Sequence, residues 1–385
     1  MRILIAHNRY QQRGGEDTVV AAESELLRSH GHEVSRLDVD NDHIQSTLTR
    51  ITASLGSFYS HHGHRLMQQA IQRHRPDIVH VHNYFPTLSP SAFYACAEAG
   101  VPVVHSLHNY RLICASAALF RDGAVCEECV SSRSTLPGIR HACYRSSHIG
   151  SAVVGMSMAI HGRVGTWSEK ISAFIALTSF AADKLGSYRL PREKIFVKPN
   201  FTIDRGVGDG SGSYALFVGR LSPEKGIKTL IEADATGGLC MNVVILGDGP
   251  MRDELLRAAE RPGSRLIWKG FVEPNQIFEY MRSARVLIWP SLCYEGGSMV
   301  LIEALSFGLP VIGADLGHGA SLILHQETGL LYHAGDHHAL AAALAGYVQK
   351  PEDEQYMRQG ARAHYLAIYT PEKNYQRLIE IYQKR

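Results

Sequence analysis

The chain has 385 residues, enough for two α/β domains that each bury a core of their own. Its residues are 45% hydrophobic and 20% charged, and the formal net charge is +2. This composition excludes an intrinsically disordered chain, and so small a charge gives no indication of nucleic-acid binding. We therefore expect a globular protein with no nucleic-acid partner.

The N-terminus passes directly from Met1 into the apolar run 2–6, without the charged and then apolar layout of a signal peptide. The longest apolar segment, Ile149 to Ile160, is shorter than the ~20 residues that a membrane-spanning helix needs. We therefore expect a cytoplasmic protein. In that reducing compartment its seven cysteines should bind metal or stay free more often than pair.

The first half alternates short β-branched runs with segments of helical spacing, which predicts a parallel sheet covered by helices. Its predicted strands are 2–6, 77–81, 102–107, 173–178 and 195–198. A glycine pair, Gly14 and Gly15, follows the first strand, and a helix is expected to begin near Thr18.

The second half repeats this alternation, with predicted strands 214–218, 242–246, 265–269, 285–289 and 310–314. The glycine-rich stretch 204–213 cannot form a core and suits a flexible linker. We therefore predict an N-terminal domain over 1–203 and a C-terminal domain over 214–364. The tail 365–385 should form one or two amphipathic helices that cross back to the N-terminal domain, sharing a face through Tyr375, Leu378, Ile379 and Tyr382.

Two glutamates follow the strand predicted at 285–289. Glu295 lies in a turn with Gly296 and Gly297, and Glu303 lies within a helix that should begin near Ser298. A glycine turn and a helix N-terminus together offer backbone N–H groups and a positive dipole to an anion such as a diphosphate. Glu303 could then accept from a ribose diol and Glu295 from sugar hydroxyls. The alternative is two solvated glutamates without a ligand.

Two cations follow the strand predicted at 214–218. Arg220 and Lys225 lie between Gly219 and Gly226. An arginine fork can hold a phosphate and a lysine adds a point charge. Because ligands bind at the carboxyl ends of strands in open α/β sheets, both cations could face the same crevice as Glu295. The alternative is a loop decorated by two solvated cations.

These motifs resemble a known family. Glu295 and Glu303, with seven residues between them, resemble the E-X7-E signature of retaining GT-B glycosyltransferases, and 219–226 is similar to their donor-phosphate loop. Segments 247–250, 269–271 and 328–331 follow in the family's order, and the resemblance to glycosyltransferase family 4 covers nearly the whole chain. It implies an α/β GT-B fold, in which two Rossmann-like parallel-sheet domains face a cleft.

The resemblance also implies a reaction. A hexose-type sugar would pass, with retention, from a nucleotide-diphosphate sugar to a glycan or lipid-linked acceptor in polysaccharide or glycoconjugate biosynthesis. Arg220 and Lys225 would stabilise the departing diphosphate, so catalysis would require no cofactor. Glu303 would hold the ribose, and the donor sugar would be oriented by Glu295, Gly296, Gly297 and Ser298.

In the N-terminal half the resemblance brings further residues to the site. It implies that Gly15, and with it Glu16, approaches the donor and the acceptor. Of the 21 histidines, most should be structural or exposed. His108 resembles the family's histidine at a strand end, which reaches the transferring sugar and could stabilise its charge. His82 is the second candidate.

The sequence departs from the family in two places. Gly297 and Ser298 stand where the family has an aromatic residue and a second glycine, which implies a wider sugar pocket. Around 317–321, Ser321 lies near the family's acidic position. These departures leave the identity of the donor open.

Four of the seven cysteines lie within thirty residues, in an insert over about 110–147. They are Cys114, Cys126, Cys129 and Cys143, and the middle two form a CxxC motif. Four thiolates can close a structural zinc site. The alternative is reduced, buried thiols.

Arginines gather in and near this insert, at 111, 121, 133, 140 and 145 and on an upstream predicted helix at 65, 73 and 75. Such a surface would suit an anionic lipid-diphosphate carrier and a peripheral contact with the inner membrane face. The alternative is scattered solvated charge.

Two other functions remain open. A different GT-B enzyme would be a phosphorylase, which needs a far larger chain, or an epimerase, which needs further acid–base carboxylates. A catalytically silent sugar-nucleotide-binding protein or zinc-stabilised scaffold would be expected to lack Arg220, Lys225 or the two glutamates, all of which are present.

Overall fold

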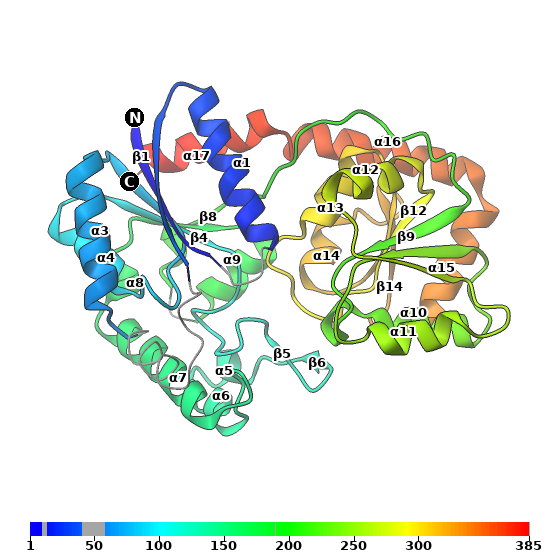
Figure 1. Ribbon diagram of the computed structural model, residues 1–385, viewed down its shortest axis with the longest axis horizontal. Coiled ribbons are helices and arrows are strands. Elements are labelled where there is room, and N and C mark those ends of the chain that lie inside the picture. Colours follow the sequence, from blue (N-terminus) through cyan, green and yellow to red (C-terminus); the bar gives the residue numbers. More distant parts are fainter. Residues whose placement is uncertain (10–13, 41–57, 189, 385) are drawn as a thin grey trace. The chain divides into compact units, whose positions relative to one another are not determined.

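The computed structural model describes residues 1–9, 14–40, 58–188 and 190–384 (Figure 1). The chain divides into two compact units. The first comprises Met1–Leu119, Cys126–Pro199 and Asn374–Arg385, and the second comprises Phe120–Val125 and Asn200–Lys373. Each unit contains one six-stranded parallel sheet.

The first sheet has the strand order β2-β1-β3-β4-β7-β8. Its strands are β1 (Arg2–Asn8), β2 (Glu33–Val39), β3 (Ile78–Asn83), β4 (Val103–Leu107), β7 (Ala173–Ala176) and β8 (Ile195–Val197). The four inner strands are continuous buried runs, as in a sheet covered on both faces. The order reverses at β1, which is the pattern of a doubly wound, Rossmann-like sheet.

Helices cover this sheet. They are α1 (Gly15–Ser29), α3 (His61–His74), α4 (Ser91–Glu98), α7 (His148–Arg163), α8 (Thr166–Glu169), α9 (Ser179–Gly186), the 3₁₀ turn η1 (Arg192–Lys194) and α17 (Pro371–Gln383). The last of these, α17, lies beside α1 (Figure 1) and packs Leu378, Ile381 and Tyr382 into the same core as Val20 and Leu27. The final helix of the chain therefore completes the core that the first strand begins.

The predicted insert is a set of short elements after β4. They are the antiparallel pair β5 (Phe120–Arg121) and β6 (Ala124–Val125), and the helices α5 (Glu128–Ser131) and α6 (Leu136–Arg140). No single element here is long enough to bury a core of its own.

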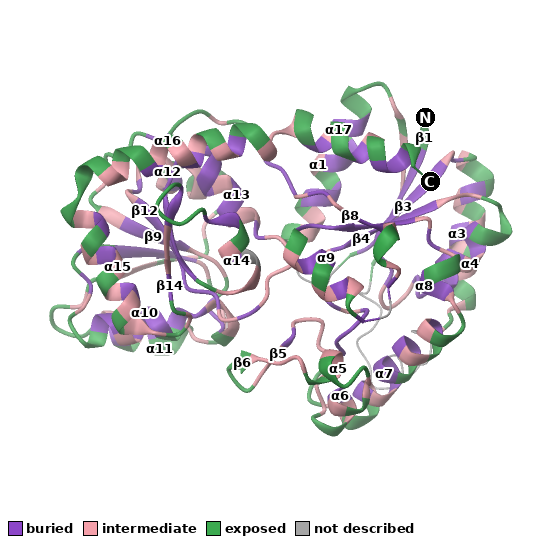
Figure 2. Cartoon of the chain, turned by 180° about the vertical axis from the view of Figure 1, so that it is seen from behind, coloured by how far each residue is buried: buried purple, intermediate pink, exposed green. Residues whose placement is uncertain are grey.

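The second sheet has the strand order β11-β10-β9-β12-β13-β14. Its strands are β9 (Tyr214–Val218), β10 (Asn242–Leu246), β11 (Leu266–Gly270), β12 (Val286–Trp289), β13 (Val311–Ala314) and β14 (Gly329–Tyr332). Alternate residues enter cores on opposite faces, so that Ala215 and Phe217 pack on one side and Leu216 on the other. Figure 2 shows the strands of both sheets buried and their helices exposed along the outer side.

The helices of the second unit are η2 (Pro223–Lys225), α10 (Ile227–Ala235), α11 (Arg252–Ala259), α12 (Pro274–Ser283), α13 (Met299–Ser306), α14 (Gly317–Leu322), α15 (His337–Gln349) and α16 (Pro351–Ile368). Helix α13 begins directly after Ser298, and α10 begins at Ile227, as the sequence predicts.

The predicted α/β class with two parallel sheets is confirmed. All ten predicted strands are present, with ends within two residues of the expected ones. Two edge strands, β2 and β14, were not predicted. Helix α1 begins at Gly15, one turn before the expected start near Thr18.

The glycine-rich stretch 204–213, expected to be a linker, belongs to the second unit in the structure. Backbone hydrogen bonds hold it there, because the Gly208 N–H donates to the Phe307 carbonyl (2.8 Å) and the Gly212 N–H donates to the Ser283 carbonyl (2.7 Å). The division between the units lies between Pro199 and Asn200. A glycine-rich stretch can thus be fixed through its backbone groups, here with help from the ion pair of Asp204 with Arg362.

The described residues include no helix that is both long enough and apolar enough to cross a membrane.

Candidate functional site

Three loops of the second unit meet at the carboxyl ends of β9, β10 and β12. The Leu221 N–H after β9 donates to the Asp248 carbonyl after β10 (3.0 Å). The Leu292 N–H after β12 donates to the Glu224 carbonyl (2.8 Å). The segments that contain Arg220, Lys225 and Glu295 are therefore joined into one edge of the sheet, where ligands of open α/β folds bind.

Two glycines permit this close packing. A Cβ atom on Gly226, which has a positive φ of 71°, would lie 1.8 Å from the Pro290 carbonyl oxygen. A Cβ atom on Gly247 would lie 1.9 Å from the Gly219 carbonyl oxygen. Only glycine fits at either position, so these two glycines allow the loops to pack closely against one another.

The structure brings Lys225 and Glu295 together. The Lys225 Nζ donates to Glu295 Oε1 at 2.8 Å, and both side chains are largely buried. Burial lowers the pKa of Lys225, but the charge and hydrogen bond of Glu295 outweigh it and hold the pKa above its ordinary value. The ammonium group is therefore charged and ready to bind a phosphate.

Arg220 is exposed, and among the described residues no acid pairs with its guanidinium. Its donors are thus available to an anion from solvent.

The segment from Gly296 to Ser298 leads into α13. Ser298 is the N-cap residue, and it makes no side-chain hydrogen bond to the first turn. The amides of that turn therefore point out of the helix with the positive end of its dipole. The Asn200 side chain donates to the Gly297 carbonyl (3.3 Å) and so supports the turn.

Glu303 lies on the second turn of α13 and is half-buried. Burial raises its pKa to about 7, and the more distant Arg205 charge only partly opposes this. No cation in the described part of the chain lies within ion-pair distance of it. Its carboxyl group is thus free to accept hydrogen bonds from a ligand.

In the first unit, Gly15 is the exposed first residue of α1. Glu16 lies beside the buried His7 at the end of β1, with Glu16 Oε1 at 3.6 Å from His7 Nδ1. Asp17 Oδ1 lies 2.9 Å from His7 Nε2. The structure thus places Glu16 near the carboxyl end of the first sheet, where it shares His7 with Asp17.

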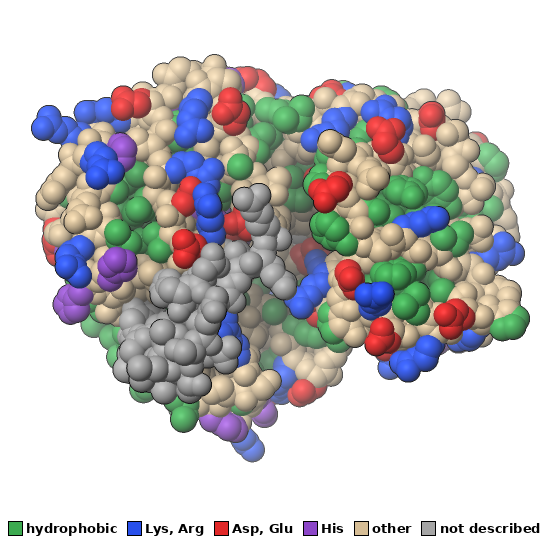
Figure 3. Space-filling view, in the orientation of Figure 1, with side chains coloured by type: hydrophobic (Ala, Val, Ile, Leu, Met, Phe, Trp, Pro, Cys, Tyr) green, Lys and Arg blue, Asp and Glu red, His purple; other side chains and the backbone are tan. Residues whose placement is uncertain are grey.

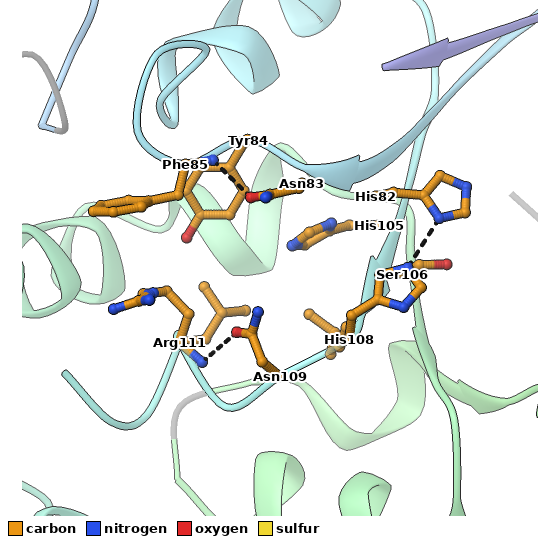
Figure 4. Close-up of a pocket in the computed structure, with 11 residues that line it drawn as sticks. His82, Asn83, Tyr84, Phe85, His105, Ser106, His108, Asn109 and Arg111 are labelled. Carbon is orange, nitrogen blue, oxygen red and sulfur yellow. Dashed lines mark hydrogen bonds between the residues drawn. The ribbon is translucent and has the colours of Figure 1, made fainter. Parts of the chain in front are cut away.

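A pocket lies where β3 and β4 end (Figure 4). His82 and His108 both line it, and His82 Nδ1 lies 2.9 Å from His108 Nε2. Its cavity of about 40 Å³ could hold a few waters or one polar group of a ligand. Arg111 lines the same pocket and stacks over the ring of Phe85, with its guanidinium carbon 4.8 Å from the ring centroid.

A network of buried polar side chains lies behind this pocket. Glu23 is fully buried on α1, and its Oε2 accepts from Lys198 Nζ at 2.7 Å. Its Oε1 lies 3.1 Å from His80 Nδ1 and 3.3 Å from His82 Nε2. On the far side, Tyr382 OH of α17 lies 2.8 Å from His80 Nδ1.

The network keeps its groups in definite charge states. Burial raises the pKa of Glu23, yet the Lys198 charge and the two histidines outweigh it and hold this pKa well below its ordinary value. Burial lowers the pKa of His82 to about 3, and it lowers the pKa of His108 well below the ordinary value. Glu23 is thus a carboxylate, and His82 and His108 are neutral imidazoles.

Glu23, His80 and His82 are also the described residues whose ligand atoms lie close enough together to share a metal ion. A divalent ion there would lie next to the Lys198 ammonium group in a fully buried site, and the repulsion would be large. Both ring nitrogens of His80 already have hydroxyl partners, Tyr382 and Ser106. We therefore interpret the cluster as an ion pair with hydrogen-bonded histidines.

No disulfide joins the four cysteines of the insert, and they lie near one another. Burial raises the pKa of the Cys129 thiol to about 11, and the thiols of Cys114, Cys143 and Cys126 contribute in the same direction. The Gly138 N–H opposes this by donating to the Cys129 sulfur. Within the described residues, these sulfurs do not approach one another as closely as the ligand atoms of Glu23, His80 and His82.

The sequence did not single out Glu23 or Lys198. One signal was available for Glu23, because it lies between Val19, Val20 and Leu26, Leu27 on the apolar face of α1. A charged residue on a helix face that is otherwise apolar must find a buried partner. That partner, Lys198, is far away in the sequence and had no comparable signal.

Two doubly wound α/β units, each with one six-stranded parallel sheet, define a protein of the GT-B fold. Two family models match the chain, one described as glycosyltransferase family 4 over residues 13–203 and one as glycosyl transferases group 1 over residues 205–364. The chain belongs to glycosyltransferase family 4, so the family expected from the motifs is confirmed.

Relatives support this assignment. The chain is 26% identical to a phosphatidyl-myo-inositol mannosyltransferase of Mycolicibacterium smegmatis, in a match that covers 92% of this chain and 84% of the relative. It is 31% identical to the D-rhamnosyltransferase WbpZ of Pseudomonas aeruginosa, in a match that covers 41% of this chain and 42% of the relative. The chain thus spans less than half the length of WbpZ in that match.

The fold is also similar to that of a solved structure. Anabaena HepE in complex with UDP aligns over 100% of both chains with a TM-score of 0.69 and 17% identity. At this identity the likeness concerns the fold alone.

Proposed function

We propose that the chain is a retaining glycosyltransferase that moves a hexose-type sugar from a nucleotide-diphosphate sugar to a glycan or a lipid-linked acceptor. The observation that supports this most is the arrangement before and within α13, where charged Lys225 pairs with Glu295 and Glu303 keeps a carboxyl group without a cation partner. A diphosphate could replace Glu295 as the partner of Lys225, and a ribose could bind Glu303.

The proposed chemistry is electrostatic. Arg220 and Lys225 neutralise the charge that develops on the diphosphate as the glycosidic bond breaks, so no metal is needed for catalysis. The amides from Gly296 to Ser298 and the Glu295 carboxylate orient the donor sugar. In the first unit the candidates for contact with the sugars are Gly15, Glu16, His82 and His108.

Relatives support a donor of this kind without specifying it. Their names include a mannosyltransferase and a rhamnosyltransferase, and HepE binds UDP. The base and sugar of the donor can be found by measuring which nucleotide sugars protect the protein against thermal unfolding, because a ligand at 100 times its Kd stabilises by about 2.7 kcal/mol.

Release of nucleotide diphosphate from the donor so identified tests the proposed site. Lys225→Ala and Glu303→Ala should each reduce this release at least about 100-fold, because each removes a group that acts on the diphosphate or the ribose. Lys228→Ala is the matched control, since Lys228 is exposed on α10 and pairs only with Glu232. Near-normal turnover by either site variant would contradict the assignment.

A catalytically silent sugar-nucleotide-binding protein is the second candidate, since the same groups could bind a donor without using it. Binding and turnover separate the two functions. Thermal protection by a nucleotide sugar, with no diphosphate released in the presence of any acceptor, would favour the silent protein.

We also propose that the first unit contacts an anionic membrane surface on the cytoplasmic side. Residues 129–168 contain four arginines and no aspartate or glutamate. On α7 the side chains of Ile149, Met156 and Ile160 are exposed, and their spacing of seven and four residues places them on one face. An exposed apolar face with basic neighbours is typical of helices that lie in a lipid interface.

Vesicle co-sedimentation tests this contact. The protein should sediment with vesicles that contain phosphatidylglycerol and not with pure phosphatidylcholine, and Ile149→Ser with Ile160→Ser should abolish the difference. Binding to both kinds of vesicle, or an unchanged difference in the double variant, would contradict the contact.

For the cysteine insert we propose a structural zinc ion bound by Cys114, Cys126, Cys129 and Cys143. Support comes from the four cysteines of one insert that form no disulfide, and from the position of Cys114, Cys126 and Cys143, which lie close enough to Cys129 to add to the effect of burial on its pKa. Zinc would draw the sulfurs together and ionise them.

Metal analysis tests the zinc site. It should find one zinc per chain, and the double variant Cys129→Ser with Cys143→Ser should lose this zinc. Protein with intact thiols but no stoichiometric metal would refute the site.

A further inference from the structure

A chain of three buried side chains connects the core of the first unit to the pocket at β3 and β4. Glu23 Oε1 lies 3.3 Å from His82 Nε2, and His82 Nδ1 lies 2.9 Å from His108 Nε2. Neither Glu23 Oε1 nor His82 Nε2 has a well-aligned hydrogen bond within the described residues. Glu23 Oε1 also lies 3.1 Å from His80 Nδ1, and a carboxylate oxygen can accept from both rings, so it remains the acceptor that faces His82 Nε2.

The proton positions follow from the charge of Glu23. A carboxylate only accepts hydrogen bonds, so the proton of neutral His82 belongs on Nε2, facing Glu23. His82 Nδ1 is then an acceptor, and the 2.9 Å contact requires a proton on His108 Nε2. A neutral imidazole has one proton, so His108 Nδ1 is left as an acceptor.

Lys198, which is itself held by Asn374, keeps Glu23 in the carboxylate form. Lys198 Nζ donates to its second oxygen at 2.7 Å, and Lys198 also lies 3.3 Å from Asn374 Oδ1 on α17. Removing this ammonium group would leave a fully buried carboxylate without its countercharge. The charge that decides the proton positions is thus itself fixed by an ion pair.

The second histidine of the cluster does not disturb this order. His80 Nε2 lies 2.8 Å from Ser106 Oγ, and its Nδ1 lies 2.8 Å from Tyr382 OH. Both partners are hydroxyl groups, which can donate or accept. His80 Nδ1 also faces Glu23 Oε1 at 3.1 Å, and because that oxygen can accept from both rings, a proton on His80 Nδ1 does not take the acceptor away from His82.

The open nitrogen of His108 belongs to the pocket. His108 lines the cavity together with His105, Asn109 and Arg111. Figure 4 shows the contact with His82 at one ring nitrogen and none at the other, and no described residue bonds to His108 Nδ1. A ligand group that enters the pocket can reach it.

We propose that Glu23 and His82 are positioning residues, which hold His108 as a neutral imidazole with its proton on Nε2, so that Nδ1 accepts a hydrogen bond from a sugar hydroxyl in the pocket. The sugar as the source of the hydroxyl rests on the proposed function, whereas the tautomer does not. A substrate analogue that lacks this hydroxyl leaves a buried acceptor unpaired, so such analogues are rejected.

Nitrogen NMR of histidine-labelled protein tests the tautomer directly, because protonated and unprotonated imidazole nitrogens resonate far apart. The His108 signals, assigned by their loss in His108→Gln, should show a protonated Nε2 and an unprotonated Nδ1 at neutral pH. A proton on Nδ1, or a doubly protonated ring, would overturn the proposal.

Glu23→Gln with Lys198→Met tests the cause. It removes both buried charges together, so no charge is left unpaired, and a glutamine amide can donate to or accept from His82. His108 should then show a mixture of tautomers, and kcat should fall about tenfold at an unchanged KM for the nucleotide sugar, the loss expected for one misoriented hydrogen bond. An unchanged single tautomer would contradict the role of Glu23.

Tyr382→Phe is the matched control, since it removes a hydrogen bond from the same network on the side of His80. It should leave the His108 signals unchanged. If no nucleotide sugar binds or reacts, the proposed function fails, but the tautomer and its dependence on Glu23 can still be measured.

Discussion

Glu23 and Glu303 are both removed from water, yet their surroundings move their pKa values in opposite directions. Glu23 has a buried ammonium group at 2.7 Å and is a carboxylate. Glu303 has no cation within ion-pair distance among the described residues, and burial raises its pKa to about 7. The first arrangement stabilises a fixed charge, and the second keeps a group available to a ligand at a cost in stability.

For Glu303 this cost predicts a gain in stability on substitution. Its folded pKa of about 7 lies above its unfolded value, so the folded state binds more protons and loses stability as the pH rises toward 7. At pH 8 the free energy of unfolding of Glu303→Gln should therefore exceed that of the wild type by on the order of 2 kcal/mol, and its unfolding temperature should be higher. At pH 4 the two proteins should unfold at nearly the same temperature. An equal midpoint at pH 8 would contradict the raised pKa.

The same group predicts how nucleotide binding depends on pH. A ribose hydroxyl donates to the carboxylate form, so affinity should rise as Glu303 ionises through pH 7 and level off above it. Calorimetry in buffers of different ionisation enthalpy should detect a proton released on binding near pH 6. Glu303→Gln should bind more weakly and lose this proton release.

Some of the residues discussed could be found from the sequence and others could not. Arg220, Lys225 and Glu295 follow predicted strands, and Glu303 lies on the helix expected after Glu295, so a local pattern indicated all four as candidates. Glu23 and Lys198 come together only through the fold, 175 positions apart, and no local pattern indicates such a pair.

The loops at the carboxyl ends of β9, β10 and β12 depend on glycine more than on any side chain. Gly226→Ala would place a Cβ atom 1.8 Å from the Pro290 carbonyl oxygen, at a φ of 71°. The loop would have to move. We therefore expect the free energy of unfolding to fall by about 2 kcal/mol or more, the cost of a severe backbone clash, and nucleotide binding to be lost.

Gly346→Ala is the control for this prediction. Gly346 lies on the exposed side of α15, and nothing lies within 4 Å of a Cβ atom built on it. Alanine should therefore stabilise the helix by about 0.5 to 1 kcal/mol and leave nucleotide binding unchanged. Thermal midpoints with and without a nucleotide sugar check both variants, and equal behaviour of the two would contradict the close approach at Gly226.

The inner strands were predicted because they are continuous apolar runs. The edge strand β2 contains Glu33, Arg36 and Asp38 and pairs on one side only, so its composition does not distinguish it from a loop. The edge strand β14 has only four residues. The stretch 204–213 was expected to be a linker because glycine composition predicts flexibility. That composition does not reveal the backbone hydrogen bonds that the stretch makes to distant segments.

Charge is distributed without a dominant sign over the molecule. Figure 3 shows Lys and Arg interspersed with Asp and Glu over the second unit, where the sequence contains no long run of one charge. The net charge of the second unit therefore gives no long-range attraction for an anion, and in the proposed function a diphosphate is recognised by the few cations at the strand edge.

The core of the first unit depends on the last helix of the chain. Leu378 is fully buried there against Val20 and Leu27. Leu378→Asp should destabilise the first unit by 3 kcal/mol or more, about the cost of burying an unpaired charge, and leave the second unit intact. Hydrogen exchange followed by mass spectrometry should show faster exchange in β1 and β3 and unchanged exchange in β9 and β10.

Glu380→Ala, at an exposed position of the same helix, should change neither unit. Equal loss of protection in both sheets of Leu378→Asp would instead mean that the two units unfold as one.

The place of α17 in the first unit also bears on the order in which the chain folds during synthesis. Residues 200–373 leave the ribosome before 374–385, so the second unit has all of its sequence available while the first unit still lacks its final helix. Until then, His80 has no Tyr382 and Lys198 has no Asn374. The unit that is begun first is thus completed after the second one, and Lys198 gains its contact with Asn374 only once residues 374–385 have been made.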